Sequence, residues 1–114
     1  MSTQDAIKTT TPSDGVAVVS PSTDIDLSRS PDLRAALRRA LDDGAKTLVV
    51  DLGDVEYMDS SGLATLVEIM RHAKSSGATM KLAALHEKVR AIFEIARLDQ
   101  FFTIVPSVED ALNT

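Results

Sequence analysis

The sequence predicts one α/β domain with the element order ββαβαβαβα and a mixed, mostly parallel sheet whose first strand is an antiparallel edge. The chain has 114 residues, about the length of a single domain. Its content of 44% apolar and 25% charged residues is ordinary for a globular protein. After an opening pair of strands, short apolar runs alternate with amphipathic helical patterns, which is the arrangement that joins parallel strands through crossovers.

The first half of the chain carries clear boundary signals. Strands are expected over residues 6–11 and 16–20, joined by Pro12-Ser13-Asp14-Gly15, because proline and glycine suit a reversing turn. The first helix is expected to begin at Ser30-Pro31-Asp32, with Ser30 as N-cap, and to end at Gly44.

The second half continues the alternation of strands and helices. The β-branched run 47–51 predicts a buried strand, and a loop, 52–60, follows it. Apolar residues at helical spacing from Ser61 to Ser75 predict the second helix, before Gly77. Ser107 and Asp110 predict a capped final helix. The remaining expected elements are strands 79–83 and 101–105 and a third helix over 87–96.

Composition excludes several classes of function. The absence of cysteine excludes disulfide scaffolds, thiolate nucleophiles and zinc ribbons. A net charge of −5 has the wrong sign for a nucleic-acid partner. We find no signal-peptide pattern and no apolar run near the roughly 20 residues that span a bilayer. We therefore expect a cytoplasmic protein without a membrane span, a single domain over 1–114, with 1–5 as a loose N-terminal tail.

The run Asp59-Ser60-Ser61-Gly62 stands where the second helix begins. Free backbone N–H groups and the helix dipole would stabilise an anion on Ser60 or Ser61 there, by about 0.3 to 1 kcal/mol. The competing interpretation is ordinary capping, because Asp and Ser are preferred N-caps worth about 1 kcal/mol. Gly62 is a poor helix former, and we interpret it as removing side-chain bulk so that another protein can approach the hydroxyls.

Acidic residues follow the two strands that should be central. Because parallel neighbours end at the same edge of a sheet, the carboxylates should form one acidic rim. We expect a solvated face rather than a metal site, and a basic partner stays an open alternative. The rim consists of Asp24, Asp26, Asp54, Glu56 and Asp59.

Enzyme motifs are missing from the sequence. The run before Gly62 lacks the leading glycine of a nucleophile elbow, and the five glycines are too dispersed for a phosphate-binding loop or a dinucleotide fingerprint. His72 and His86 are expected on solvated surfaces rather than as general bases. We predict a protein that is not an enzyme and has no cofactor.

The central segment resembles the signature of STAS domains, especially the single-domain anti-sigma-factor antagonists of bacterial partner-switching systems. The residues that carry the resemblance are Val49-Val50-Asp51-Leu52 and Val55-Glu56-Tyr57-Met58-Asp59-Ser60-Ser61-Gly62-Leu63. The likeness covers nearly the whole chain from about Ala6. It extends to Asp24-Ile25-Asp26, the helix from Pro31, residues 89–98 and Phe102-Thr103-Ile104.

The resemblance implies a phosphorylation switch. Ser60 would be the phosphoacceptor, with Ser61 as the second choice. The unphosphorylated form would bind an anti-sigma factor that is also a serine/threonine kinase and so release the sigma factor, and a serine phosphatase would reverse phosphorylation. Asp59 would hold the loop, and Asp24 would line the kinase-facing surface. The implied partner-binding residues are Asp24, Asp26, Asp59, Ser61, Gly62 and Leu63.

Two other functions stay open. One is a STAS adaptor subunit in a lipid-transport or stress-signalling complex. The other is a receiver-like phosphoacceptor domain, although no lysine follows the last expected strand.

The chain differs from the family at Thr23, where a glycine is usual, and a Cβ there restricts the backbone of the loop that precedes the first helix. We expect a monomer or a weak dimer.

Overall fold

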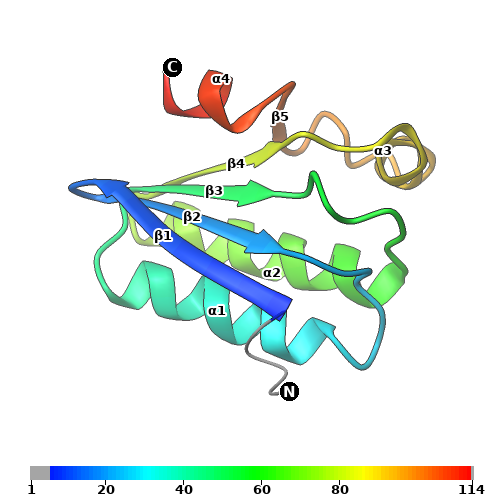
Figure 1. Cartoon of the computed structure of the whole chain (residues 1–114), viewed down its shortest axis with the longest axis horizontal. Helices are drawn as coiled ribbons and strands as arrows, with labels where there is room; N and C mark the ends of the chain where they lie inside the picture. Colours follow the sequence, from blue (N-terminus) through cyan, green and yellow to red (C-terminus); the bar gives the residue numbers. More distant parts are fainter. Residues whose placement is uncertain (1–5, 114) are drawn as a thin grey trace.

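The computed structural model describes residues 6–113 and confirms the predicted order ββαβαβαβα. The expected tail, 1–5, lies outside the described residues. Five strands form one sheet in the order β1-β2-β3-β4-β5 (Figure 1). The edge strand β1 pairs antiparallel with β2, and the other pairs are parallel. The strands are β1 (Ile7–Ser13), β2 (Val16–Pro21), β3 (Thr47–Asp51), β4 (Thr79–Ala83) and β5 (Thr103–Val105).

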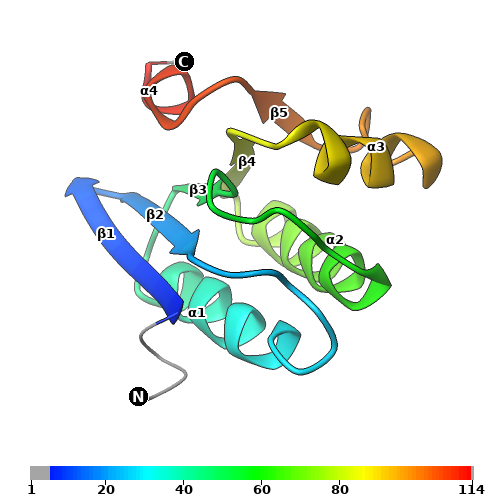
Figure 2. The same cartoon turned by 45° about the vertical axis from the view of Figure 1, so that its right-hand side comes forward.

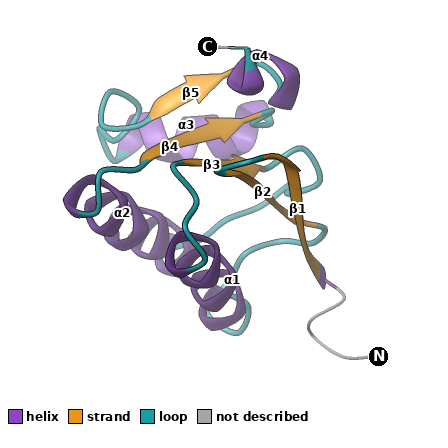
Figure 3. Ribbon diagram, turned by 90° about the vertical axis from the view of Figure 1, so that its left-hand side faces the viewer, coloured by secondary structure: helices purple, strands orange, loops and turns teal. Residues whose placement is uncertain are grey.

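The helices lie on both sides of the sheet. On one side, α1 (Ser30–Asp42) and α2 (Ser60–Ser75) lie next to each other, whereas α4 (Val108–Leu112) lies on the opposite side (Figures 1 and 3). A cluster of buried apolar side chains lies on each face of the sheet. The strands contribute to both clusters, because successive side chains of a strand point to opposite faces. Leu48 and Val50 pack with the buried residues of α1 and α2, whereas Val49 packs with Ala111 of α4.

The third helix, α3 (Glu87–Ile95), adds to the larger core through Val89 and Phe93, which are fully buried. Phe93 meets Phe102 edge to face, with 5.5 Å between ring centroids. Phe102 was expected inside the last strand, but β5 starts one residue later. The larger core therefore continues past α2 to the β5 side of the molecule.

The opening hairpin is longer than predicted. Pro12 was expected in the turn but lies within β1, and the turn is confined to Asp14 and Gly15, which has a φ of +74°. The pairing with β2 is irregular between Thr10 and Ser13. Proline is tolerated there because β1 is an edge strand, in which a missing N–H need not interrupt a ladder on both sides.

One predicted helix cap is confirmed and another is wrong. Ser107 accepts a hydrogen bond of 3.0 Å from the backbone N–H of Asp110, as expected. Ser30 is not an N-cap, because α1 begins at this residue and its cap position, Arg29, makes no side-chain capping bond. The buried Ser30 hydroxyl instead donates to the carbonyl of Asp26 at 2.8 Å. The Ser30 side chain therefore makes its contacts inside the molecule instead of capping the helix.

Candidate functional site

The site is built from the two loops that leave the carboxyl ends of β2 and β3, residues 22–29 and 52–59. They run side by side toward α1 and α2 (Figure 2). Ile25 forms an isolated parallel bridge with Met58. The N–H of Ile25 donates to Tyr57 at 3.0 Å, and the N–H of Asp59 donates to Ile25 at 3.0 Å. Both loops therefore determine where α2 begins.

Asp24 adds a side-chain contact to this pairing. Its Oδ1 accepts hydrogen bonds from the backbone N–H groups of Glu56, at 3.3 Å, and Tyr57, at 3.1 Å. Thr23 causes no strain beside it, since positive φ among the non-glycine residues of 6–113 is limited to Ala84 and Arg97. The Asp24 carboxylate thus holds the second loop, a contact that the sequence did not reveal.

Asp59 is the N-cap of α2. Its Oδ1 accepts hydrogen bonds from the backbone N–H of Ser61, at 2.9 Å, and from the Ser61 hydroxyl, at 2.5 Å. The hydroxyl bond is the main cause that lowers the pKa of Asp59, and backbone N–H groups, including that of Leu27, lower it further. This carboxylate is therefore ionised at neutral pH.

Asp26 has a similar role in the first loop. Its Oδ1 accepts bonds from the Ser28 hydroxyl, at 2.7 Å, and from the N–H groups of Ser28 and Arg29, at 3.0 Å each. The Ser28 hydroxyl is the largest cause that lowers the pKa of Asp26, followed by the Arg29 N–H. Asp26 therefore fixes the backbone of the loop residues that lead into α1.

The two adjacent serines of α2 have different surroundings. Ser61 is half-buried, and its hydroxyl lies 2.8 Å from the buried Ser30 hydroxyl in addition to its bond with Asp59. Ser60 is exposed, and its hydroxyl makes no hydrogen bond with any residue that the structure describes. The Asp59–Ser61–Ser30 contacts thus join the starts of α1 and α2 and leave Ser60 accessible.

Two apolar side chains are exposed close to Ser60. Leu27 is 76% exposed and Tyr57 is 53% exposed. Tyr57 comes three residues before Ser60 in the chain, and the Leu27 backbone N–H lies near enough to Asp59 to contribute to the lowering of its pKa. Neither residue is predictable from the sequence as a surface residue, because an apolar residue in a loop carries no local signal of its exposure. We call Leu27, Tyr57 and Ser60 the switch surface.

The expected reason for Gly62 is corrected by the structure. Gly62 is buried in the first turn of α2, so it does not open the surface to another protein. A Cβ on Gly62 would lie 2.5 Å from Cγ of Met58 and 2.9 Å from Cγ2 of Ile25. Glycine is therefore needed for the two paired loops to pack on α2. Leu63 is half-buried against the main core.

The rest of the predicted acidic rim faces solvent. Asp54 and Glu56 are exposed, and within residues 6–113 no cluster of three His, Cys, Asp or Glu residues has the arrangement of a metal site. The exposed His86 lies with Nε2 2.6 Å from the Gly53 carbonyl oxygen. None of the helices in the described part of the chain is long and apolar enough to cross a bilayer.

Comparison with known proteins identifies consistent relatives. A family model described as the STAS domain matches residues 8–111. The anti-sigma-B factor antagonist of Bacillus subtilis is 35% identical over 90 residues, which cover 79% of this chain and 82% of the relative. An anti-sigma factor antagonist from Mycobacterium paratuberculosis is 32% identical with a TM-score of 0.83, covering 96% of this chain and 93% of that one.

The fold is also that of the anti-sigma factor antagonist SpoIIAA from Bacillus. Its unphosphorylated form has a TM-score of 0.81 at 21% identity and covers 95% of this chain and 94% of its own. Its phosphorylated form has a TM-score of 0.74 at 20% identity, with coverage of 95% and 97%. The same arrangement of elements thus occurs in SpoIIAA with and without a phosphoryl group.

The capping role of Asp59 predicts a pH dependence of stability. Because folding lowers its pKa, the unfolded chain binds more protons at acid pH. The contribution of Asp59 to the free energy of unfolding is fully present above the ordinary Asp pKa of 3.8 and is lost as the pH falls through the lowered pKa. In urea unfolding between about pH 6 and pH 2, Asp59→Asn should have a shallower decline in unfolding free energy than the wild type. The control is Asp54→Asn, and equal flattening by both would contradict the assignment.

The packing of Gly62 predicts a cost for one added methyl group. Gly62→Ala should lower the unfolding free energy by about 1 to 3 kcal/mol, because the Cβ collides with Met58 and Ile25. Met58→Ala removes the nearer obstacle, so the double variant should be less destabilised than the sum of the single changes. Denaturant unfolding of the three variants measures this coupling. Strict additivity would exclude the proposed collision.

Proposed function

The chain belongs to the STAS domain family, and on that basis we propose that it is an anti-sigma-factor antagonist with a phosphorylation switch at Ser60. The unphosphorylated form binds an anti-sigma factor that is a serine/threonine kinase and thereby releases a sigma factor. Phosphorylation of Ser60 ends this binding, and a serine phosphatase restores it. The Bacillus subtilis and Mycobacterium paratuberculosis relatives, each above 30% identity, support the antagonist role. This role is regulatory rather than enzymatic and places the protein in the cytoplasm.

The different surroundings of Ser60 and Ser61 are the observation that carries the choice of phosphoacceptor. Ser60 is exposed and its hydroxyl is not engaged by any described residue, so a kinase reaches it without breaking a contact. Phosphoryl transfer to Ser61 would first require loss of its hydrogen bond with Asp59 and of its close contact with the Ser30 hydroxyl. Breaking such bonds typically costs about 0.5 to 1.5 kcal/mol each. Accessibility therefore favours Ser60.

The switch surface explains binding by the unphosphorylated form. Leu27 and Tyr57 are large apolar side chains left in water beside the acceptor, and burying them against a partner is favourable at about 25 cal/mol per Å². Asp24 is assigned a positioning role, because it holds the backbone of Tyr57. Asp26, Asp59, Ser61 and Gly62 hold the two loops and the start of α2, and Leu63 supports the first turn from the core.

A phosphate on Ser60 would oppose binding without unfolding the domain. It adds about −1.5 to −2 charges beside the ionised Asp59. At the start of α2 the free protein tolerates this group, because a helix N-terminus favours anions. At an interface the phosphate must lose water and meets the carboxylates of the acidic rim. The solved phosphorylated form of SpoIIAA is consistent with a fold that accepts the modification.

The first prediction from this function concerns the acceptor. With lysate of the native cell as the source of kinase and with ATP, wild type and Ser61→Ala should gain one phosphate, whereas Ser60→Ala should gain none. Ser61→Ala should also lose about 1 kcal/mol of stability, because its hydroxyl contacts are removed. Intact-mass and fragment mass spectrometry locate the phosphate. Stoichiometric phosphorylation of Ser60→Ala would show that another residue is the acceptor.

The second prediction concerns partner binding. Immobilised wild type and Ser60→Ala should retain an ATP-binding serine kinase from the native lysate, and Ser60→Asp should retain at least about tenfold less. Ser75→Asp, an equivalent change at the other end of α2, is the control and should bind like wild type. The melting temperature of Ser60→Asp should stay near that of the wild type, because an acid is favourable at a helix N-terminus. Equal capture of scaffold or transport subunits by all four proteins would instead indicate a structural adaptor.

A further inference from the structure

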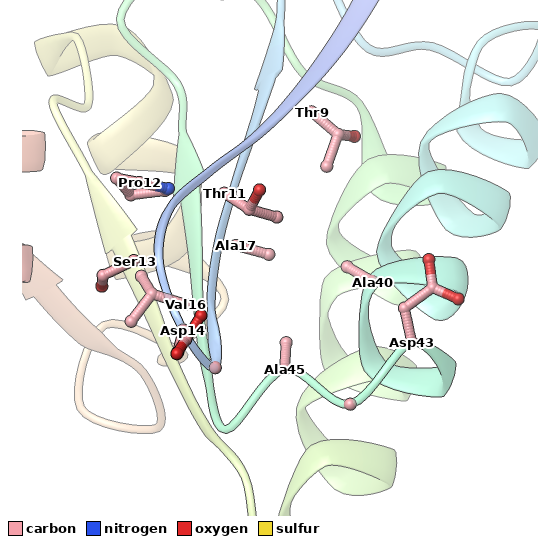
Figure 4. A pocket seen from close by; sticks show the side chains of 12 residues that line it. Thr9, Thr11, Pro12, Ser13, Asp14, Val16, Ala17, Ala40, Asp43 and Ala45 are labelled. Atoms are coloured by element: carbon pink, nitrogen blue, oxygen red, sulfur yellow. The ribbon is translucent and has the colours of Figure 1, made fainter.

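A groove separates the edge strand β1 from helix α1. It consists of two adjoining hollows of about 430 and 440 Å³, which share Thr9, Ala40 and Asp43. Figure 4 shows the first of the two. Thr9 and Thr11 of β1 line one side, and Ala36 and Ala40 of α1 line the other. The groove exists because β1 is not covered by a helix and the α1 residues opposite it are small. None of the residues that line it belongs to the switch surface.

Strand β1 also has an open edge. It pairs with β2 on one side, and on its other side the described residues provide no strand. The segment Thr9-Thr10-Thr11 is β-branched throughout and favours an extended backbone that is ready to pair. Lys8 and Pro12 flank this segment, so a further strand is accepted only in a register that avoids them.

The charged residues along the groove of one molecule are complementary to the same residues of a second copy. Asp32 and Arg39 of α1 both line it, and the described structure gives neither an ion pair. Their midpoint on the helix lies between Ala35 and Ala36, which also line the groove. When two α1 helices pack antiparallel about this midpoint, each Asp32 meets Arg39 of the other helix and alanines meet at the crossing. A two-fold interface requires this reciprocity.

We propose that the groove and the edge of β1 bind a second copy of this chain. The β1 strands of the two copies pair antiparallel around Thr9 and extend the sheet through both molecules. The α1 helices pack antiparallel below this junction and fill the groove. One two-fold axis produces both contacts, because β1 and α1 run in the same direction (Figure 1). Centring on Thr9 places Lys8 opposite Thr10 of the other copy, so the two lysines do not face each other.

The proposed dimer interface and the switch surface have no residue in common. The interface uses β1 and α1, whereas Ser60, Leu27 and Tyr57 belong to the loops that leave β2 and β3 and to the start of α2. Both switch surfaces would stay exposed in the dimer, so one dimer could hold two partner molecules.

Disulfide trapping tests the strand pairing. The chain has no cysteine, so Thr9→Cys introduces the sole thiol and any disulfide must join two molecules. Directly opposed residues of antiparallel strands have Cα atoms about 4.5 to 5.5 Å apart, within the range of a disulfide. Thr11→Cys lies on the same face of the same strand, but its two copies would be about 13 Å apart. Mild oxidation of the full-length protein should give a covalent dimer with Thr9→Cys and not with Thr11→Cys. Equal cross-linking of both would overturn the proposed register.

Charge exchange tests the helix contact. Sedimentation velocity of the full chain from about 1 µM to about 1 mM should show a monomer–dimer equilibrium. Arg39→Asp and Asp32→Arg should each raise the dimer Kd by about tenfold or more, because like charges then face each other twice. The double variant should restore the affinity, since both pairs reform with reversed signs. Arg38→Asp on the same helix lies outside the groove and should leave the Kd unchanged.

Three results would overturn the proposal: a wild type that is monomeric over the whole range, a dimer that Arg39→Asp does not weaken, or a double variant as weak as the single ones. Circular dichroism establishes that each variant is folded. Kinase capture by Ser60 variants is measured separately, so loss of dimerisation with intact capture rejects this inference alone. Loss of capture with an intact dimer rejects the switch alone.

Discussion

The backbone pairing between the loops that follow β2 and β3 is the constraint on which the site depends. Ile25 and Met58 are both buried where these loops meet, and their bridge joins the two loops directly to each other. The pairing also sets the start of α2, because the N–H of Asp59 bonds to Ile25. Gly62 completes the arrangement by leaving room for both buried side chains. The exposure of Ser60 is therefore a consequence of long-range packing, not of its own conformational preference.

The acidic character of this end of the molecule is largely structural. Asp24, Asp26 and Asp59 each accept hydrogen bonds from backbone N–H groups of the two loops or of the first turn of α2. Such charge-assisted bonds are stronger than neutral ones, so they add to the hold that the buried side chains of the loops provide. The carboxylates still give the surface a negative field. One set of residues thus supplies both the rigidity of the site and its electrostatic response to an added phosphate.

The arrangement of elements was predictable because its signals are local. Alternating apolar runs and helical spacings indicate each strand and helix, and parallel connections leave few possible topologies. The site was only partly predictable. Asp59 as the helix cap follows from neighbouring residues, but the contact of Ser30 with Ser61 joins segments far apart in the chain. The burial of Gly62 and the exposure of Leu27 likewise depend on how the two loops pack. Pro12 entered β1 because the strand lies at an edge, which local turn propensity does not reveal.

A switch built in this way needs no second conformation of the free protein. The hydrogen bond of Ser61 with Asp59 and its close contact with the Ser30 hydroxyl hold the start of α2, and they do not involve the Ser60 hydroxyl. Adding a phosphate to Ser60 therefore leaves the contacts that define the fold in place. Discrimination between the two states then arises at the interface, where the partner must desolvate the phosphate beside an ionised Asp59. A penalty of about 3 kcal/mol would change affinity about 150-fold, which is within the effect of one unpaired charge in an interface.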